Sequence, residues 1–255
     1  MKFNNRNIHL SASAKIGKNV RIGDNTIIYD NVTIGDNTII CNDCVIGEPT
    51  NAFYHDKNYK NEATIIGPNS LIRSHTIIYS GCNLGAGLNT GHRVTIRENT
   101  CTGQECLIST LVDIQGNCSI GNFSRLYSNV HVGQLTKIGN YVFVFPYSIF
   151  TNDPLPPSNN LKGASVDDYS IIAVHSVILP GISIGKHTLI AANSTVTRNV
   201  NDFTMVAGNP AKPIKDIREQ INKLTGKSHY PWPYFFDRGM PWEGKDYDKW
   251  LTKNP

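Results

Sequence analysis

A six-residue period runs through most of this 255-residue chain and restricts its fold more than any other feature. The phrase IGDNTII occurs at residues 22–28 and again at 34–40. Steps of six give 28 positions in three runs, 10–46, 66–150 and 166–196, and all of them are apolar except Thr90 and Thr102. Neither an α-helix nor a simple strand has a sustained period of six. The repeat therefore predicts stacked units that bury one shared apolar column.

The residues between the apolar positions predict short strands joined by tight corners. Gly often follows the apolar residue, as at Gly17, Gly23 and Gly35, and suits a corner where the backbone bends or takes a positive φ. The fourth position after the apolar residue is small or β-branched, as at Ala14 and Val20. Each hexad therefore offers one large and one small inward side chain.

Four of the six cysteines fall on the small inward position: Cys44, Cys82, Cys106 and Cys118. A free cysteine there acts as a small apolar residue. The segment CNDC at 41–44 could be a metal or redox pair. Cys41 and Cys44 occupy different positions of the hexad, however, and no second pair completes a zinc site. We expect a structural role and no metal.

Composition argues against several classes of function. The net charge of +4 is too small, and too evenly spread, to indicate nucleic-acid binding. No apolar stretch approaches the length of a membrane span, so we expect no membrane insertion. The first ten residues lack the apolar segment of a secretory signal. We therefore expect a cytoplasmic protein.

This pattern resembles the hexapeptide-repeat proteins, which fold as left-handed parallel β-helices. The resemblance covers roughly residues 10–200. In that family three hexads form one triangular coil, so it implies an all-β solenoid of about nine coils. It also implies that residues 18 apart lie one coil above another.

Two insertions interrupt the repeat, at 47–65 and 151–165, and we expect the β-helix to occupy 1–200 and a C-terminal segment to occupy 201–255. Insertions in a solenoid form loops, often on the working face. We favour a functional second loop, because Asn152 and Asp153 lie where the chain leaves the coil.

The C-terminal segment reads as a small helical and irregular cap. Apolar residues at three- and four-residue steps predict one amphipathic helix, with Pro213 in its first turn and Gly226 at its end; these residues are Ile214, Ile217, Ile221 and Leu224. The tail that follows holds all three Trp residues. We favour packing against the coil wall or a neighbouring subunit over a stacking surface for a base.

Polar residues crowd the outward positions of residues 72–99 and mark a candidate site. These residues are Arg73, His75, Tyr79, Asn89, His92, Arg93, Arg97 and Glu98. By the 18-residue spacing His75 lies beside Arg93, and His92 lies above Ser74. We take Thr90 as a further sign of a functional break, because it replaces a large apolar residue.

Three segments resemble coenzyme A-dependent acyltransferases of the β-helix family, and more narrowly the enzymes that N-acylate dTDP-linked amino sugars. The segments are Thr90–His92 (TGH), Thr151–Pro157 (TNDPLPP) and Gly208–Lys212 (GNPAK). The resemblance implies transfer of an acyl group, acetyl by default, from acyl-coenzyme A to the amino group of a nucleotide-linked amino-deoxysugar used for surface glycans. It also implies a homotrimer with active sites shared between subunits.

The same resemblance assigns roles to the candidate residues. His92, with Asn89 nearby, is the catalytic candidate, because an imidazole can take a proton from an amine at neutral pH. Arg73 and Arg97 are candidates for the diphosphate. The other acceptor-binding candidates are His75, Tyr79, Arg93, Glu98, Asn152 and Asp153. For coenzyme A, small residues would admit the pantetheine and two cations would reach its phosphates: Ala173, Ala191, Ala192, Arg198 and Lys212.

Three rival functions follow from the same pattern. A sugar O-acetyltransferase would use the same histidine on a hydroxyl group. A non-enzymatic sugar-binding scaffold is less consistent with the crowded 72–99 face. A β-helix carbonic anhydrase needs two zinc histidines close in sequence, and no two of the eight histidines lie within five residues of each other.

Overall fold

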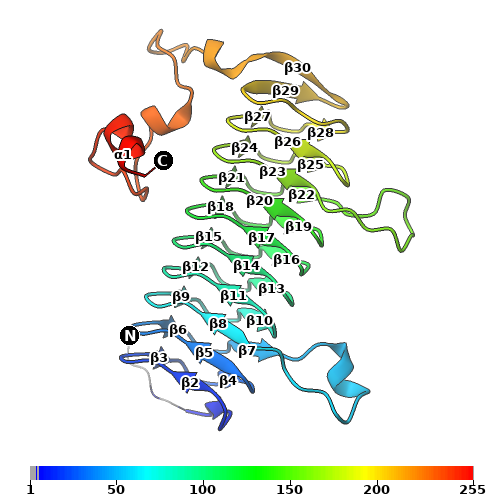
Figure 1. Ribbon diagram of the computed structural model, residues 1–255, viewed down its shortest axis with the longest axis vertical. Helices are drawn as coiled ribbons and strands as arrows, with labels where there is room; N and C mark the ends of the chain where they lie inside the picture. Colours follow the sequence, from blue (N-terminus) through cyan, green and yellow to red (C-terminus); the bar gives the residue numbers. More distant parts are fainter. Residues whose placement is uncertain (1–3, 5, 255) are drawn as a thin grey trace.

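The computed structural model describes residue 4 and residues 6–254, which form a triangular parallel β-helix (Figure 1). Each side of the triangle is one parallel sheet, here named A, B and C. Sheet A contains β1 (His9–Leu10), β4 (Ile27–Ile28), β7 (Val45–Glu48), β10 (Ile77–Tyr79), β13 (Thr95–Ile96), β16 (Asp113–Ile114), β19 (His131–Val132), β22 (Ile149–Phe150), β25 (Val177–Ile178) and β28 (Thr195–Val196).

Sheets B and C have the same construction. Sheet B contains β2 (Lys15–Ile16), β5 (Val32–Ile34), β8 (Thr64–Ile66), β11 (Asn83–Leu84), β14 (Cys101–Thr102), β17 (Ser119–Ile120), β20 (Lys137–Ile138), β23 (Ser165–Val166) and β26 (Ser183–Ile184). Sheet C contains β3 (Arg21–Ile22), β6 (Ile39–Ile40), β9 (Leu71–Ile72), β12 (Asn89–Thr90), β15 (Leu107–Ile108), β18 (Arg125–Leu126), β21 (Phe143–Val144), β24 (Ile171–Ile172), β27 (Leu189–Ile190), β29 (Thr204–Gly208) and β30 (Ala211–Asp216).

The predicted all-β solenoid with two insertions and a small C-terminal cap is confirmed. The sheets contain ten, nine and eleven strands, so the coil count differs slightly from the predicted nine. The largest count arises in sheet C, because β29 joins its end and β30 pairs with β29 in the antiparallel direction.

The hexad positions form the core, as the period predicts. From Ile28 to Val196 the large apolar residues of the repeat are almost completely buried, and the four inward cysteines are buried among them. Burial raises the pKa of Cys44, Cys82 and Cys106 to about 12. The first coil differs because it ends the stack: Leu10 is 49% exposed.

Most glycines that follow the apolar residues are needed because neighbouring coils approach closely there. The prediction that they supply a positive φ is therefore wrong for most of them. Most of them, such as Gly67, do not have a positive φ. A Cβ atom on Gly67 would lie 2.5 Å from the backbone nitrogen of Ala86 in the next coil. The positive φ falls two residues later, where Asn19 and Asn25 have φ values of 57° and 56°. Asn tolerates this left-handed conformation better than most residues.

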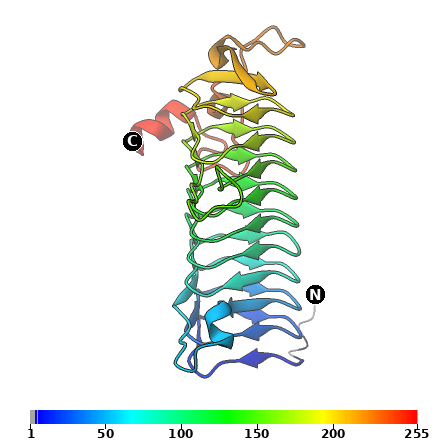
Figure 2. The same ribbon diagram turned by 90° about the vertical axis from the view of Figure 1, so that its right-hand side faces the viewer.

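Both insertions leave the solenoid at the corner between sheets A and B, so they project from the same side (Figures 1 and 2). The first follows β7 and includes the 3₁₀ helix η1 (Asn51–Tyr54), and the second joins β22 to β23. The predicted loops at 47–65 and 151–165 therefore share one edge of the solenoid.

The predicted helix over 214–224 is wrong. Ile214 belongs to the edge strand β30, and the 3₁₀ helix η2 (Ile217–Glu219) follows it. Ile214, Ile221 and Leu224 are 56%, 52% and 96% exposed, so their spacing does not produce a buried helical face. Pairing with β29 satisfies the backbone of this segment instead.

The aromatic tail packs against the coil wall, as favoured from the sequence. It includes η3 (Trp232–Tyr234) and α1 (Tyr247–Lys253). Trp232, Trp242 and Tyr247 are buried against Phe143 and the rings of the corner between sheets B and C. Those corner rings form a stacked column: Phe123, Tyr141, Tyr169, His187 and Phe203.

Within the described residues, no helix is long and apolar enough to cross a bilayer.

Candidate functional site

The corner between sheets C and A carries the first group of predicted site residues. His75 and Arg93 occupy the same corner position one coil apart, and the Arg93 amide donates a hydrogen bond to the Ser74 carbonyl at 3.1 Å. His92 is exposed, and its backbone amide donates to Thr110 Oγ1 at 3.2 Å. No hydrogen-bond partner of its imidazole occurs among residues 4 and 6–254. The ring is therefore free to meet a ligand or a second subunit.

Two more predicted residues flank this corner. Arg73 is half-buried and directly follows β9. Asn89 lies on the outer face of sheet C in β12, between Leu71 and Leu107. Asn89 and His92 thus lie on either side of Gly91, where the chain turns the corner.

Thr90 is not a break in the core, which corrects the functional interpretation. Its side chain is completely buried, and Oγ1 accepts a hydrogen bond from the Arg73 amide at 2.9 Å. Thr102 does the same for the Gly85 amide at 3.0 Å. Both threonines keep the inward position, and their hydroxyl groups are satisfied there.

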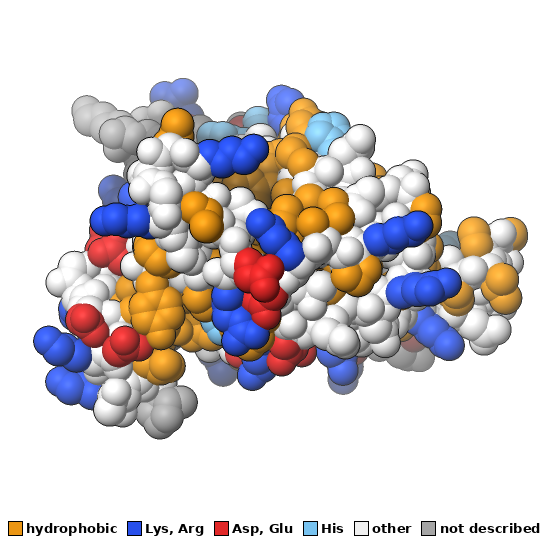
Figure 3. All heavy atoms as spheres, turned by 90° about the horizontal axis from the view of Figure 1, so that it is seen from above, with side chains coloured by type: hydrophobic (Ala, Val, Ile, Leu, Met, Phe, Trp, Pro, Cys, Tyr) orange, Lys and Arg blue, Asp and Glu red, His pale blue; other side chains and the backbone are white. Residues whose placement is uncertain are grey.

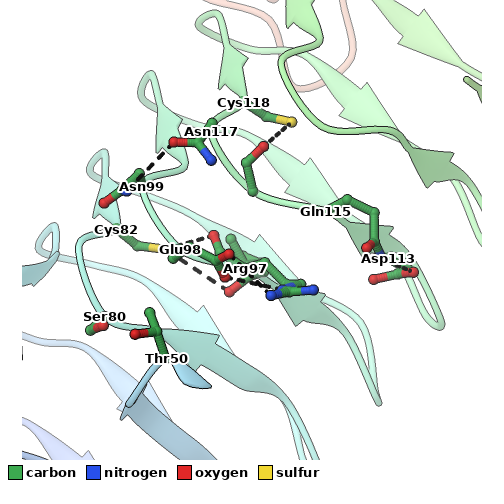
Figure 4. Close-up of polar contacts among 12 residues, drawn as sticks. Thr50, Ser80, Cys82, Arg97, Glu98, Asn99, Asp113, Gln115, Asn117 and Cys118 are labelled. Atoms are coloured by element: carbon green, nitrogen blue, oxygen red, sulfur yellow. Dashed lines mark hydrogen bonds and ion pairs between the residues drawn. The ribbon is translucent and has the colours of Figure 1, made fainter. Parts of the chain in front are cut away.

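The corner between sheets A and B carries the second group, so the polar residues of 72–99 are divided between two corners. The Arg97 guanidinium binds Glu98 through two hydrogen bonds of 3.0 Å each. It also lies over the Tyr79 ring, 5.4 Å from its centroid. These contacts hold the Arg97 side chain in one orientation on the outside of the solenoid (Figure 4).

Sequence reasoning missed a polar cluster on the outer face of sheet A, formed by Asp113, Gln115 and His131. Gln115 Nε2 donates to Asp113 Oδ2 at 2.6 Å, and His131 Nδ1 lies 3.2 Å from the same oxygen. The hydrogen bond with His131 is the main reason that the pKa of Asp113 lies below its ordinary value. The signal was present, because residues 113 and 131 are 18 apart and occupy one outward column.

In the second loop, Asp153 already has partners. Its carboxylate accepts hydrogen bonds from the Ser158 amide and hydroxyl group, both at 2.6 Å, and from the Leu155 amide at 3.0 Å. The Ser158 hydroxyl is the main cause of its lowered pKa. The Asn152 carbonyl accepts from the Lys162 amide at 2.7 Å, which closes the base of the loop. These contacts show how Asp153 shapes the loop.

The residues predicted to hold coenzyme A lie near the C-terminal end of the solenoid. Ala173 and Ala191 occupy equivalent positions of the corner between sheets C and A, and Ala192 follows there exposed to solvent. Arg198 and Lys212 line a cavity of about 460 Å³ with apolar residues of the last strands. The view from this end shows apolar surface between separate Lys and Arg side chains (Figure 3). The structure thus brings together the two predicted cations.

A metal centre has no support in the geometry. Over residues 4 and 6–254, no group of three or more His, Cys, Asp or Glu side chains is arranged to hold a metal ion.

Two solved structures are similar to parts of this chain. The UDP-N-acetylglucosamine acyltransferase of Francisella novicida is 21% identical with a TM-score of 0.46, covering 82% of this chain and 68% of that one. The perosamine N-acetyltransferase of Caulobacter crescentus, solved with CoA and GDP-perosamine, is 21% identical with a TM-score of 0.40, covering 58% of this chain and 57% of that one.

Curated relatives match only part of the chain. The bifunctional protein GlmU of Prochlorococcus marinus is 28% identical over 174 residues, which are 59% of this chain and 39% of the relative. The 2,3,4,5-tetrahydropyridine-2,6-dicarboxylate N-acetyltransferase of Clostridium perfringens is 39% identical over 70 residues, 28% of this chain and 29% of the relative. The chain therefore spans well under half the length of these relatives.

A family model supplies the remaining comparison. Residues 13–48 match the model described as bacterial transferase hexapeptide (six repeats). These residues build the first coils, and the same period continues through the rest of the solenoid. Residues 13–48 of this β-helix are thus similar to the bacterial transferase hexapeptide repeat.

Proposed function

We propose that this chain is an acyl-coenzyme A-dependent acyltransferase that N-acylates a nucleotide-linked amino-deoxysugar, with acetyl as the default group. The observation that carries the proposal is the cavity shared by Arg198 and Lys212. The apolar half of its lining suits a pantetheine arm, and its two cations suit phosphate groups. One curated relative, matched over 70 residues, is an N-acetyltransferase, which supports an amine as acceptor.

The reaction needs a proton acceptor and close alignment of two substrates. Amide formation requires a neutral amine next to the thioester carbonyl carbon. His92, exposed at the corner between sheets C and A, is the proposed base, and Asn89 precedes this corner on the outer face of β12. Arg73 and Arg97 are the proposed contacts for the diphosphate, since guanidinium groups bind phosphate oxygens in pairs.

We also propose a homotrimer that shares its sites. Large apolar side chains are exposed along the corner that carries His92: Leu111 (48%), Phe145 (36%) and Tyr147 (51%). Exposed apolar residues that follow one edge of a solenoid are expected to be covered by a partner. A monomer in sedimentation would contradict this assembly.

The decisive experiment combines acyl-coenzyme A donors with dTDP- and UDP-linked sugars that carry either an amino or a hydroxyl group, and it measures release of free thiol. Thiol release with amino sugars is the expected result. Release only with the hydroxyl sugars would indicate an O-acetyltransferase. No coenzyme A binding by calorimetry would point to a sugar-binding scaffold.

A further inference from the structure

Between β4 and β28, Asp113 and His131 are the two ionisable residues in a column of apolar and Thr side chains on the outer face of sheet A. The other outward residues of the column, from β4 to β28, are Ile27, Val45, Ile77, Thr95, Ile149, Val177 and Thr195. Asp113 lies between Thr95 and His131 in this column, and partial burial of its carboxylate must be offset by hydrogen bonds. The cluster is therefore unlike the rest of this face.

The two hydrogen bonds of Asp113 converge on a single oxygen. Gln115 Nε2 and His131 Nδ1 both contact Oδ2, at 2.6 and 3.2 Å. Within residues 4 and 6–254, no group donates a hydrogen bond to Oδ1. An ionised carboxylate accepts at both oxygens, and the Asp113 side chain is 40% exposed. The carboxylate is therefore held from one side and open to a ligand on the other.

Arg97 adds a cation close to this carboxylate. Its guanidinium uses Nε and Nη2 for Glu98, so Nη1 is left for another acceptor. The charge of Arg97 contributes, after the hydrogen bonds, to the lowered pKa of Asp113. Figure 4 shows both side chains on the same side of the solenoid. This surface thus presents the Arg97–Glu98 ion pair, with Arg97 Nη1 still available as a donor, beside the Asp113 carboxylate.

We propose that Asp113 Oδ1 accepts an N–H from the acceptor's amino group, while Arg97 Nη1 donates to the phosphate of the same molecule. The ligand class is a sugar that carries an amine at one end and a nucleoside diphosphate at the other. Asp113 is thereby the residue that selects an amine over a hydroxyl group. This inference rests on the proposed function and deepens it.

The chemistry of acyl transfer explains why this contact discriminates. The acceptor atom forms a bond to the thioester carbonyl carbon, the C–S bond breaks, and the acceptor loses one proton, which ends on the departing thiolate. A primary amine keeps one N–H in the amide product. A hydroxyl group has a single hydrogen and keeps none in the ester. Only an amine can therefore donate to Asp113 from the bound state through to the product.

The test measures binding by calorimetry, with a dTDP-linked amino sugar and its hydroxyl counterpart as paired ligands. Asp113→Ala should weaken binding of the amino sugar roughly 10–100-fold, as expected for loss of a hydrogen bond to a charged group. Asp113→Asn should weaken it less, because an amide oxygen still accepts. Asp113→Ala should weaken binding of the hydroxyl sugar several-fold less, because a bound hydroxyl donates a neutral O–H to Asp113 whereas the amino group binds as a charged ammonium. As a control, Asp167→Asn removes an exposed carboxylate at the corner between sheets B and C. It should leave the binding of both sugars unchanged.

Two results would overturn the inference: equal weakening of both ligands in Asp113→Ala, or unchanged binding of the amino sugar. Circular dichroism of each variant shows whether the fold is intact. His131→Gln leaves the carboxylate charge in place, so it should weaken binding of the amino sugar less than Asp113→Ala does. Turnover is measured separately. If the amino sugar binds through Asp113 but releases no thiol with any donor, the proposed function fails while this inference stands.

Discussion

Replacement of Thr90 by Val should destabilise the solenoid by about 1–3 kcal/mol, the cost of a buried donor left without a partner. The Arg73 amide donates to Thr90 Oγ1 at 2.9 Å, and the backbone pairing between β9 and β12 is limited to Asn89 with Leu71. Valine has nearly the same shape but no hydroxyl group, so the Arg73 N–H would lose its acceptor. The side chain is completely buried, which excludes water as a substitute.

Thr102 provides the matched control. The Gly85 amide donates to Thr102 Oγ1 at 3.0 Å but also to the Thr102 carbonyl at 3.2 Å. Thr102→Val should therefore cost less than about 1 kcal/mol, because a backbone acceptor remains. Urea unfolding of both variants at one protein concentration gives the two free energies. Equal losses of stability would refute the reasoning that the Arg73 amide depends on the Thr90 side chain.

Four further predictions concern the site and the core. If His92 is the base, His92→Ala should lower kcat about 10²–10⁴-fold with little change in either KM, as measured by steady-state kinetics. If His92→Asn keeps most of the activity, His92 only orients the substrate. Arg198→Ala and Lys212→Ala should each raise KM for acyl-coenzyme A and leave KM for the sugar unchanged; a shift confined to the sugar would mean that the cavity holds the other substrate. Exposed Cys101 should react with a thiol reagent in the folded protein, whereas Cys44, Cys82 and Cys106 should react only after unfolding. Because burial raises the pKa of these three thiols from 9.0 to about 12, the unfolded chain loses their protons first, so stability should fall as pH rises above about 9.

The period of six was sufficient to predict the architecture, because one rule decides which side chain points inward in every hexad. It placed the buried cysteines correctly and located both loops. It did not separate the two kinds of corner position. Gly67 is needed because the next coil passes close to its Cα, whereas Asn19 supplies the positive φ. A repeat shows which residues recur but not which contact requires each one.

Reasoning from the sequence was weakest where contacts depend on neighbouring coils or sheet edges. Ile214 and Ile217 fit a helical spacing, yet β29 offered an unpaired edge that this segment fills. Asp113 and His131 form a pair only because three hexads make one coil and sheet A stacks them. His92 was placed at an exposed corner correctly, but its catalytic role is a prediction that only kinetics can test.

The aromatic tail changes how the solenoid behaves as a whole. In stacked coils each repeat touches only its neighbours, so stability normally varies along the axis and the ends fray. Here the Trp232 indole donates to the Tyr169 carbonyl at 2.8 Å, and Arg125 donates to the Arg238 carbonyl at 2.8 Å. One segment of chain thus fastens together coils that do not touch each other. We therefore expect the C-terminal half to unfold more cooperatively than the N-terminal coils, and local opening to begin at the N-terminal end.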